Sequence, residues 1–287
     1  MNSITSALTW IAVAAICLFA LPVLAVIRLF DRTPTQLYAG RAFRVMGSWT
    51  TRINPAWNVE IGGVDPKTLE HPFVVVSNHQ SVADIPTVSL LPWEMKWVGK
   101  KELFDLPVMG WMMKLAGDIA VDRKDPNSRA SVMLRTRQKL QHGTSVMFFA
   151  EGTRSRDGRV KRFYDGAFRL AIEAGVPVLP LAIDGTMDAI PKHGWRYNRA
   201  DVRLDVLEPV PTTGLTLEDV AALRDRVRQR IVEHIAAWRE VPAELADALI
   251  DATPALEAGA GVSEMAVPTG EERAKSGVAV PRAGSGG

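Results

Sequence analysis

The sequence predicts an α/β fold: a mostly buried mixed sheet flanked by helices, with an N-terminal hydrophobic membrane-anchoring helix. Two observations carry this prediction. Short runs rich in β-branched and aromatic residues alternate with helical patterns from residue 57 to residue 209, which favours a largely buried sheet. Ahead of them, residues 4–27 form one apolar stretch that holds no charged side chain.

Length and composition narrow the class of protein. The chain has 287 residues, of which 47% are hydrophobic, so it can bury one large core or two small ones and is not wholly disordered. A formal charge of +2 gives no case for bulk binding of nucleic acid, which usually needs a much more basic domain. The single cysteine, Cys17, excludes a disulfide framework and a thiolate metal cluster, and leaves the redox compartment open.

Residues 1–33 are expected to form a membrane anchor. At about 1.5 Å per residue, a helix over residues 4–27 could cross a hydrocarbon core of roughly 30 Å. A secretory signal peptide is the competing interpretation, but residues 1–3 lack the basic side chain that usually begins one. Pro22 should kink the helix, so a bent helix that enters one leaflet is an alternative to a full span.

Basic residues follow the apolar stretch, at Arg28, Arg32, Arg41, Arg44 and Arg52. The positive-inside bias then places everything after residue 28 on the cytoplasmic side of the cell membrane. Residues 36–52 mix apolar and arginine side chains at roughly helical spacing. They fit an interfacial helix with arginines toward lipid headgroups and an ordinary core helix equally well.

Candidate strands and one clear helix organise the middle of the chain. The strands are expected at residues 59–61, 73–77, 95–98, 118–121, 145–149, 178–183 and 202–207. The helix covers residues 126–141, with Asp125 as its N-cap and Gly143 just past its end. Residues 103–113 are rich in Leu and Met; they could line a groove for an acyl chain or dock on the bilayer, but packing in the core is favoured.

A second helix is expected after residue 216. Thr216 and Asp219 have the spacing of a capping box. Apolar side chains then recur on one face and predict core contact rather than a partner groove: Val220, Leu223, Val227, Ile231, Ile235 and Trp238. From residue 242 onward Ala, Gly, Glu and Pro dominate, so residues 242–287 are expected to form a disordered tail.

The main candidate for chemistry is the pair His79 and Asp84, which follows the valine run at residues 74–76. Five residues turn an α-helix by roughly 500°, so the two side chains cannot share one helix face. They can meet if a strand ends at His79 and a helix begins near Asp84, with Pro86 in a tolerated early position. An aspartate that accepts the imidazole N–H leaves the other ring nitrogen free to act as a base.

Other interpretations of this stretch stay open. Asp84 could merely cap a helix, or form a capping box with Ser81. Ser81 could be a nucleophile, although the Gly-x-Ser-x-Gly pattern is absent. A metal site would need a third ligand, which the sequence does not place beside His79 and Asp84.

A second cluster follows the apolar run at residues 145–149 and consists of Glu151, Gly152, Thr153 and Arg154. Gly152 lets the backbone approach a ligand closely, and Arg154 can hold a phosphate with its forked guanidinium. A solvated basic loop fits equally well. Arg123 is a second phosphate candidate, but a surface ion pair is its favoured interpretation from the local sequence alone.

Four motifs taken in order resemble the glycerolipid acyltransferase family, with the closest likeness to bacterial 1-acyl-sn-glycerol-3-phosphate acyltransferases. The likeness covers residues 36–210. The motifs are Asn78-His79-x4-Asp84, Gly117-x-Ile119-x3-Arg123, Phe149-Ala150-Glu151-Gly152-Thr153-Arg154-Ser155 and Val176-Pro177-Val178-Leu179-Pro180. Two positions depart from the family pattern, because Ala150 stands where many members have proline and Ala120 where a bulkier residue is frequent.

The resemblance implies an acyltransferase domain at residues 34–241. His79 would take the proton from the free hydroxyl of 1-acyl-sn-glycerol 3-phosphate as that hydroxyl attacks an acyl thioester, and Asp84 would orient His79. Arg123 and Arg154 would contact the phosphate, and Pro180 is associated with the acyl-donor side. The residues associated with acceptor binding would be Glu151, Gly152, Thr153 and Arg154.

The implied reaction produces phosphatidate in phospholipid biosynthesis. Acyl-CoA or acyl carrier protein would be the co-substrate, membrane lipid the other partner, and no metal or redox cofactor is expected. Two alternatives are an acyltransferase for another lysophospholipid or acyl acceptor, and a non-catalytic membrane lipid-binding protein.

Overall fold

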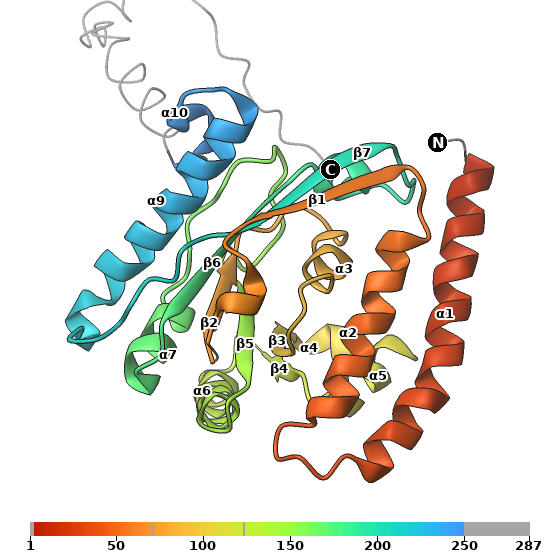
Figure 1. The fold of residues 1–287 in the computed structure, drawn as a ribbon, viewed down its shortest axis with the longest axis horizontal. Helices are drawn as coiled ribbons and strands as arrows, with labels where there is room; N and C mark the ends of the chain where they lie inside the picture. Colours follow the sequence, from red (N-terminus) through yellow and green to blue (C-terminus); the bar gives the residue numbers. More distant parts are fainter. Residues whose placement is uncertain (1–2, 71, 123, 250–287) are drawn as a thin grey trace, which may run out of the picture. The chain divides into compact units, whose positions relative to one another are not determined.

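The computed structural model describes residues 3–70, 72–122 and 124–249 (Figure 1). Within these residues seven strands form one sheet, in the order β1-β7-β6-β2-β5-β3-β4. The strands are β1 (Trp57–Gly63), β2 (Val74–Ser77), β3 (Met95–Lys100), β4 (Ile119–Val121), β5 (Ser145–Phe149), β6 (Val178–Asp184) and β7 (Ala200–Val206). The helices are α1 (Ser3–Phe30), α2 (Leu37–Arg52), α3 (Asp84–Val88), α4 (Lys101–Phe104), α5 (Met109–Leu115), α6 (Pro126–Gln141), α7 (Gly166–Ala174), α8 (Thr186–Ala189), α9 (Val220–Arg239) and α10 (Ala243–Ala246), with 3-10 turns η1 (Pro66–Thr68) and η2 (Leu217–Asp219).

The sheet is mixed, as predicted. β2 runs parallel to both β5 and β6, and β3 runs parallel to β4 and β5. The only antiparallel pair is β6 and β7. The edge strand β1 runs parallel to β7. Because β2, β5 and β6 run in one direction, the segments that follow them leave the sheet at the same edge.

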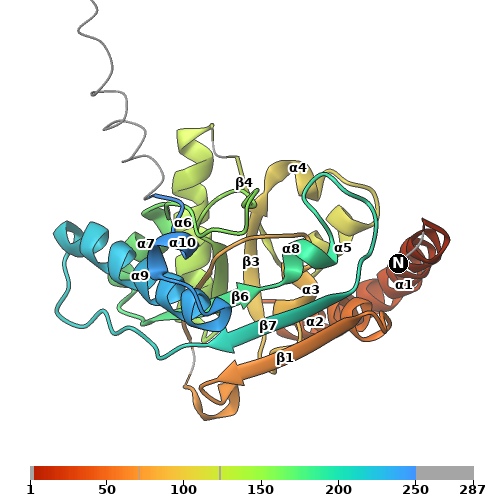
Figure 2. The same cartoon turned by 90° about the horizontal axis from the view of Figure 1, so that it is seen from above.

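Alternate side chains of the strands enter two separate cores. Val74 and Val76 face α7 and α9, whereas Val75 faces the segment around α3. Figure 2 shows α6, α7 and α9 on one side of the sheet and α1, α2 and α3 on the other. Burial on both faces explains why the sequences of the central strands are continuous apolar runs. Each of the seven strands lies where the sequence predicts one.

Both predicted helix starts are confirmed. The Asp125 carboxylate accepts the Asn127 N–H at 2.9 Å and begins α6, which covers the predicted residues 126–141. Thr216 and Asp219 form the reciprocal capping box ahead of α9. The apolar stripe of α9 lies in the core, with Leu223, Val227 and Ile231 buried.

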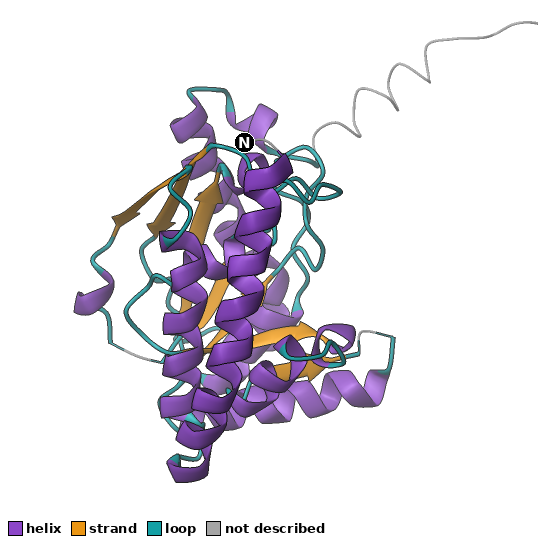
Figure 3. Cartoon of the chain, turned by 90° about the vertical axis from the view of Figure 1, so that its right-hand side faces the viewer, coloured by secondary structure: helices purple, strands orange, loops and turns teal. Residues whose placement is uncertain are grey.

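The apolar N-terminal stretch forms one continuous helix, α1, which is long and apolar enough to cross a membrane. It lies beside α2 along the right-hand edge of Figure 1, and Figure 3 gives a view onto the pair. Ala20 and Leu24 are buried against α2 and α5. The opposite side exposes large apolar side chains, at Ile4, Leu8, Ile11, Leu18, Phe19, Val26, Leu29 and Phe30.

The helix α2 combines the two interpretations that the sequence left open. Arg41 and Arg52 are exposed, as an interfacial helix requires. Arg44 instead points into the protein and forms an ion pair with buried Asp118, with 2.6 Å from Nη2 to each carboxylate oxygen. Asp118 also accepts the Trp97 N–H, so this arginine fastens α2 to the sheet and is not a headgroup ligand.

A second buried ion pair lies under the same helix. The Lys96 side chain is fully buried and donates to Glu94 Oε1 at 2.7 Å and to the carbonyl oxygens of Gln36 and Ala116. Gly40 makes room for this pair, because a Cβ atom there would overlap Glu94 Oε1. These three bonds offset the cost of burying the Lys96 charge, whereas Oε2 of Glu94 has no hydrogen-bond partner among the described residues and burial raises the pKa of Glu94.

Residues 103–113 divide between core and surface. Phe104 and Met112 are buried, which supports the favoured interpretation for half of the stretch. Leu106 and Trp111 are 46% and 52% exposed, on the same part of the molecule as α1.

The first residues of the predicted tail are structured. Residues 243–246 form α10, and Asp247 pairs with buried Arg228 of α9 through Nη1–Oδ2 at 2.9 Å and a second contact from Nη2. A buried ion pair holds these residues against α9, which the composition alone does not indicate. Residues 250–287 of the expected tail lie outside the described residues.

Candidate active site

The pair His79 and Asp84 lies at a strand-to-helix corner. β2 ends at Ser77 and α3 begins at Asp84, as the spacing argument required. The five-residue turn brings Nδ1 of His79 to 2.6 Å from Oδ2 of Asp84. Asp84 is fully buried, whereas 15% of the His79 side chain is exposed. With Nδ1 engaged, the second ring nitrogen, Nε2, is the one available to a ligand.

Asp84 is held by four donors. Its Oδ2 atom accepts the backbone N–H groups of Gln80 at 2.7 Å and Ser81 at 3.0 Å besides the imidazole, and Oδ1 accepts the hydroxyl of Thr186. Asp84 therefore both orients His79 and satisfies the turn before α3. It does not cap that helix, because Ala83 is the N-cap and no side chain makes a capping bond there. Sequence reasoning missed Thr186; its position two residues after the end of β6 was the only available signal.

The ring of His79 stacks on Phe149. Their centroids are 3.9 Å apart and the planes differ by 13°. Phe149 ends β5, the strand next to β2, and Ser77 and Phe149 are register partners. Phe149 was not predicted to have a role, although it belongs to the third motif.

The turn after β5 is hydrogen-bonded to the backbone of His79 on both sides. Oε1 of Glu151 accepts the His79 N–H at 2.9 Å, and the Ser155 N–H donates to the His79 carbonyl at 2.7 Å. Gly152 permits this turn because its φ is +71°, a conformation that a side chain disfavours. Ala150, which stands where many family members have proline, also contributes a bond to this turn. Its N–H donates to the Ser77 carbonyl at 3.2 Å, a bond that proline could not make.

Glu151 is buried, and burial raises the pKa of its carboxyl group from the ordinary value of 4.5 to about 8. The His79 N–H and the nearby charge of Lys161 oppose that shift. Its Oε2 atom has no hydrogen-bond partner among the described residues, and the Lys161 ammonium lies 3.9 Å from it. At neutral pH the protonated carboxyl group can therefore act as a donor at Oε2.

The cationic side chains predicted to hold a phosphate differ in their placement. Arg154 lies on the turn after β5, and its guanidinium makes no ion pair with any described residue. Thr153 is exposed, and its hydroxyl accepts a hydrogen bond from Lys161 at 2.6 Å. Arg123 lies outside the described residues, so the structure does not place that candidate.

Pro180 is not brought to His79. It lies inside β6, paired with Val76 of β2, and alternation puts it on the face of Val178 and Ala182. His79 stacks on Phe149, which packs against the opposite core. Pro180 has no backbone N–H to donate. Its carbonyl accepts the Leu207 N–H just past the end of β7, so the nitrogen of Pro180 faces no residue of that strand.

The alternative that uses Ser81 as a nucleophile loses support. Ser81 is fully buried and its hydroxyl donates to the Ile190 carbonyl at 2.6 Å, so it is not exposed to a substrate. Among the described residues no cluster of three His, Cys, Asp or Glu side chains could hold a metal ion.

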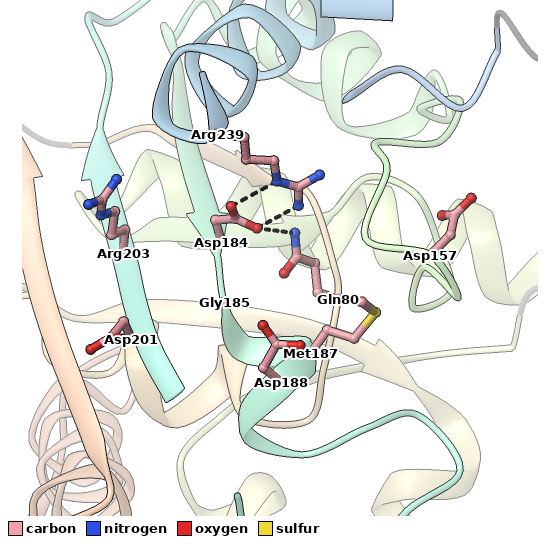
Figure 4. Close-up of a pocket in the computed structure, with 9 residues that line it drawn as sticks. All are labelled: Gln80, Asp157, Asp184, Gly185, Met187, Asp188, Asp201, Arg203 and Arg239. Atoms are coloured by element: carbon pink, nitrogen blue, oxygen red, sulfur yellow. Dashed lines mark hydrogen bonds and ion pairs between the residues drawn. The ribbon is translucent and has the colours of Figure 1, made fainter. Parts of the chain in front are cut away.

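A polar pocket of about 410 Å³ lies behind the corner (Figure 4). Its centre is an ion pair between Asp184 and Arg239, and Gln80 donates to the same carboxylate at 3.1 Å. Because Gln80 follows His79 directly, this network holds the backbone of the corner. Gln80 and Arg239 also donate to the Gly158 carbonyl, which lies in the segment after β5.

An orienting aspartate and a partly exposed imidazole beside a glycine turn have the geometry of a general base. Residues 58–184 match a protein-family model described as Acyltransferase. This match covers the strands and turns that carry His79, Asp84 and the segment from Glu151 to Arg154, and it agrees with the family that the sequence motifs resemble.

Known proteins of this family are similar over much of the chain. A 1-acyl-sn-glycerol-3-phosphate acyltransferase from Brassica napus is 37% identical over 63% of this chain and 52% of its own length. The human enzyme named 1-acyl-sn-glycerol-3-phosphate acyltransferase alpha is 38% identical over 64% of each chain. The chain thus spans about half to two thirds of these curated relatives.

A solved structure extends the likeness beyond the family model. The crystal structure of the 1-acyl-sn-glycerophosphate acyltransferase PlsC from Thermotoga maritima matches with a TM-score of 0.66 and 27% identity. The match covers 82% of this chain and 98% of that one.

Proposed function

We propose that the protein transfers an acyl group from an acyl thioester to the free hydroxyl of 1-acyl-sn-glycerol 3-phosphate, forming phosphatidate. The observation that carries the proposal is the His79–Asp84 pair, held at 2.6 Å beside the turn that presents Arg154. Acyl-CoA and acyl carrier protein are both compatible donors. The names of the similar proteins support the choice of acceptor.

In this mechanism His79 acts as the general base. Its Nε2 takes the proton of the acceptor hydroxyl while the hydroxyl oxygen attacks the thioester carbonyl. The carbon–sulfur bond then breaks, and the imidazolium returns its proton to the leaving thiolate. Such proton transfer typically contributes roughly 10² to 10⁴ in rate. Asp84, fixed by Thr186 and two backbone N–H groups, keeps the Nδ1 proton in place and stabilises the imidazolium.

We further propose that α1 lies within one leaflet on the cytoplasmic side. Two contacts near its start join it to the catalytic body, because Ser6 Oγ accepts the Tyr197 N–H and Trp10 Nε1 donates to the Trp195 carbonyl. Its second half packs on α2 and α5 through Ala20 and Leu24. A helix joined to the body along its length cannot cross the bilayer unless those contacts break.

The reaction is tested with purified full-length protein in lipid micelles. Acyl-CoA or acyl carrier protein is supplied with lysophosphatidate, other lysophospholipids or no acceptor, and mass spectrometry identifies the products. We expect phosphatidate from lysophosphatidate, and loss of the reaction in His79→Ala. Full turnover in His79→Ala would refute the mechanism, and acylation of only another lysophospholipid would replace the proposed acceptor.

A further inference from the structure

The loop at residues 191–199 joins α8 to β7 and is fastened to three parts of the molecule. Tyr197 is buried between Trp57, whose ring stacks on it at 5.4 Å, and Trp10 of α1, which meets it edge-on at 5.1 Å. Just before the loop, the Ile190 carbonyl accepts the hydroxyl of Ser81. The loop is therefore fixed both to α1 and to the corner that carries His79.

Lys192 extends from this loop to the turn after β5. Its ammonium donates to the Arg154 carbonyl at 2.6 Å. Lys161 donates to the same carbonyl oxygen at 3.4 Å and to Thr153 Oγ1 at 2.6 Å. Two ammonium groups from different segments thus meet at the backbone oxygen of Arg154, whose own guanidinium has no ion-pair partner among the described residues.

Positive charge at this point exceeds the negative charge that could balance it. Removal from water and then the charges of Lys161, Arg156 and Arg154 lower the pKa of Lys192. The carboxyl group of Glu151, which offsets these charges, is buried and itself favours the neutral form. Cations gathered in this way repel one another unless an anion lies between them.

We propose that Lys192 is a phosphate-binding residue for the lysophosphatidate acceptor, and that it completes with Lys161 and Arg154 a cationic site beside His79. This inference rests on the proposed function. In lysophosphatidate the phosphate sits on the carbon next to the one that bears the reacting hydroxyl, so a base at His79 requires a phosphate site close by. The Ser155 N–H bond to the His79 carbonyl holds the turn at that distance.

The donor also carries phosphates when it is a CoA ester, but these lie at the far end of a long pantetheine arm from the thioester. A site joined to the His79 backbone is too close to the reacting atoms for them. The KM for each substrate therefore distinguishes the two sources of phosphate.

The test compares Lys192→Ala, Lys192→Arg and the control Lys67→Ala in the full-length protein. Lys67 lies in η1, ahead of β2 and so at the opposite edge of the sheet. Initial rates are measured with lysophosphatidate and with a 1-monoacylglycerol of the same chain length, at varied acceptor and varied acyl-CoA. We expect Lys192→Ala to raise the KM for lysophosphatidate about tenfold or more, because charged hydrogen bonds are the stronger ones.

Four further results belong to the expected pattern. The kcat of Lys192→Ala stays within about twofold, its KM for acyl-CoA is unchanged, its rate with monoacylglycerol is unchanged, and Lys192→Arg recovers most of the affinity. An unchanged KM for lysophosphatidate, or an equal loss with both acceptors, would overturn the proposal, the second because it would mark Lys192 as a structural brace. A raised KM for acyl-CoA alone would assign the cations to the donor and overturn it too.

The same assay separates this inference from the proposed function. If the wild-type protein makes no phosphatidate, the proposed function fails before any variant is considered. If the wild type makes phosphatidate and Lys192→Ala does so with the same KM, only the role of Lys192 fails.

Discussion

The ring of Phe149 lies against the imidazole of His79, nearly parallel to it, with 3.9 Å between their centroids. Phe149 also contacts Trp97 at 5.5 Å, and the guanidinium of Arg44 lies 5.2 Å above the Trp97 ring. Because Arg44 belongs to α2, a continuous series of contacts connects the helix pair α1–α2 with the proposed base. The orientation of His79 is thus fixed by Asp84 at its edge and by Phe149 at its face.

Phe149→Leu should lower kcat by about threefold to tenfold, since an aromatic pair contributes roughly 0.5–1.5 kcal/mol beyond its buried area. The KM for the acceptor should change little, because Phe149 orients the base. Initial rates with lysophosphatidate test this. Phe148→Leu is the matched control, as Phe148 packs on the opposite core. Equal losses in the two variants would indicate general loosening of β5 and contradict the positioning role.

Thr186→Val should lower kcat by about tenfold or more, because it leaves an oxygen of buried Asp84 without its hydroxyl donor. Thr186→Ser keeps the hydroxyl and should recover most of the rate. The matched control is Thr136→Val, a buried threonine that donates only within α6. Activity in Thr186→Val equal to that of the wild type would rule out a contribution of this bond to the positioning of Asp84.

Glu151 should make the protein less stable as the pH rises from about 5 to 8. Its carboxyl pKa is about 8 in the folded protein against 4.5 ordinarily, so the folded state binds the extra proton in this range. The stability present below pH 4.5 is lost as the pH rises through 8, by an amount on the order of a few kcal/mol.

Glu151→Gln removes this titration, so its unfolding temperature should fall less over the same pH range than that of the wild type. Thermal unfolding in detergent at several pH values measures the difference. Glu60→Gln, at an exposed carboxylate of β1, should follow the wild-type curve. Parallel curves for Glu151→Gln and the wild type would show that Glu151 does not titrate there.

Arg44→Met should destabilise the protein by about 3–5 kcal/mol, because it leaves the charge of Asp118 buried and unpaired. The unfolding temperature should fall by roughly 10 °C or more. Arg169→Met breaks an exposed ion pair with Glu173 and should change it by less than about 2 °C. A similar small effect in Arg44→Met would mean that the Arg44–Asp118 pair does not fasten α2 to the sheet.

Local patterns predicted the elements well. The seven strands and the α6 and α9 helices lie where periodicity and capping residues indicated, because both signals come from residues close together in the chain. The corner at His79 and Asp84 was also accessible, since only five residues separate the two. Arg44 shows where such reasoning ends, because its local pattern does not reveal a partner 74 residues away.

The chain by itself determined the α/β class, the apolar helix at its start and the pairing of His79 with Asp84, because each depends on neighbouring residues. The tertiary structure decided what surrounds that pair. Thr186, Phe149 and Lys192 approach the corner only because parallel strands bring the ends of β2, β5 and β6 to one edge of the sheet. Pro180 lies in β6, the strand that leads to Thr186. Strand alternation nevertheless places Pro180 on the face of the sheet opposite to Phe149. Such contacts depend on the register between distant strands, which no short stretch of sequence encodes.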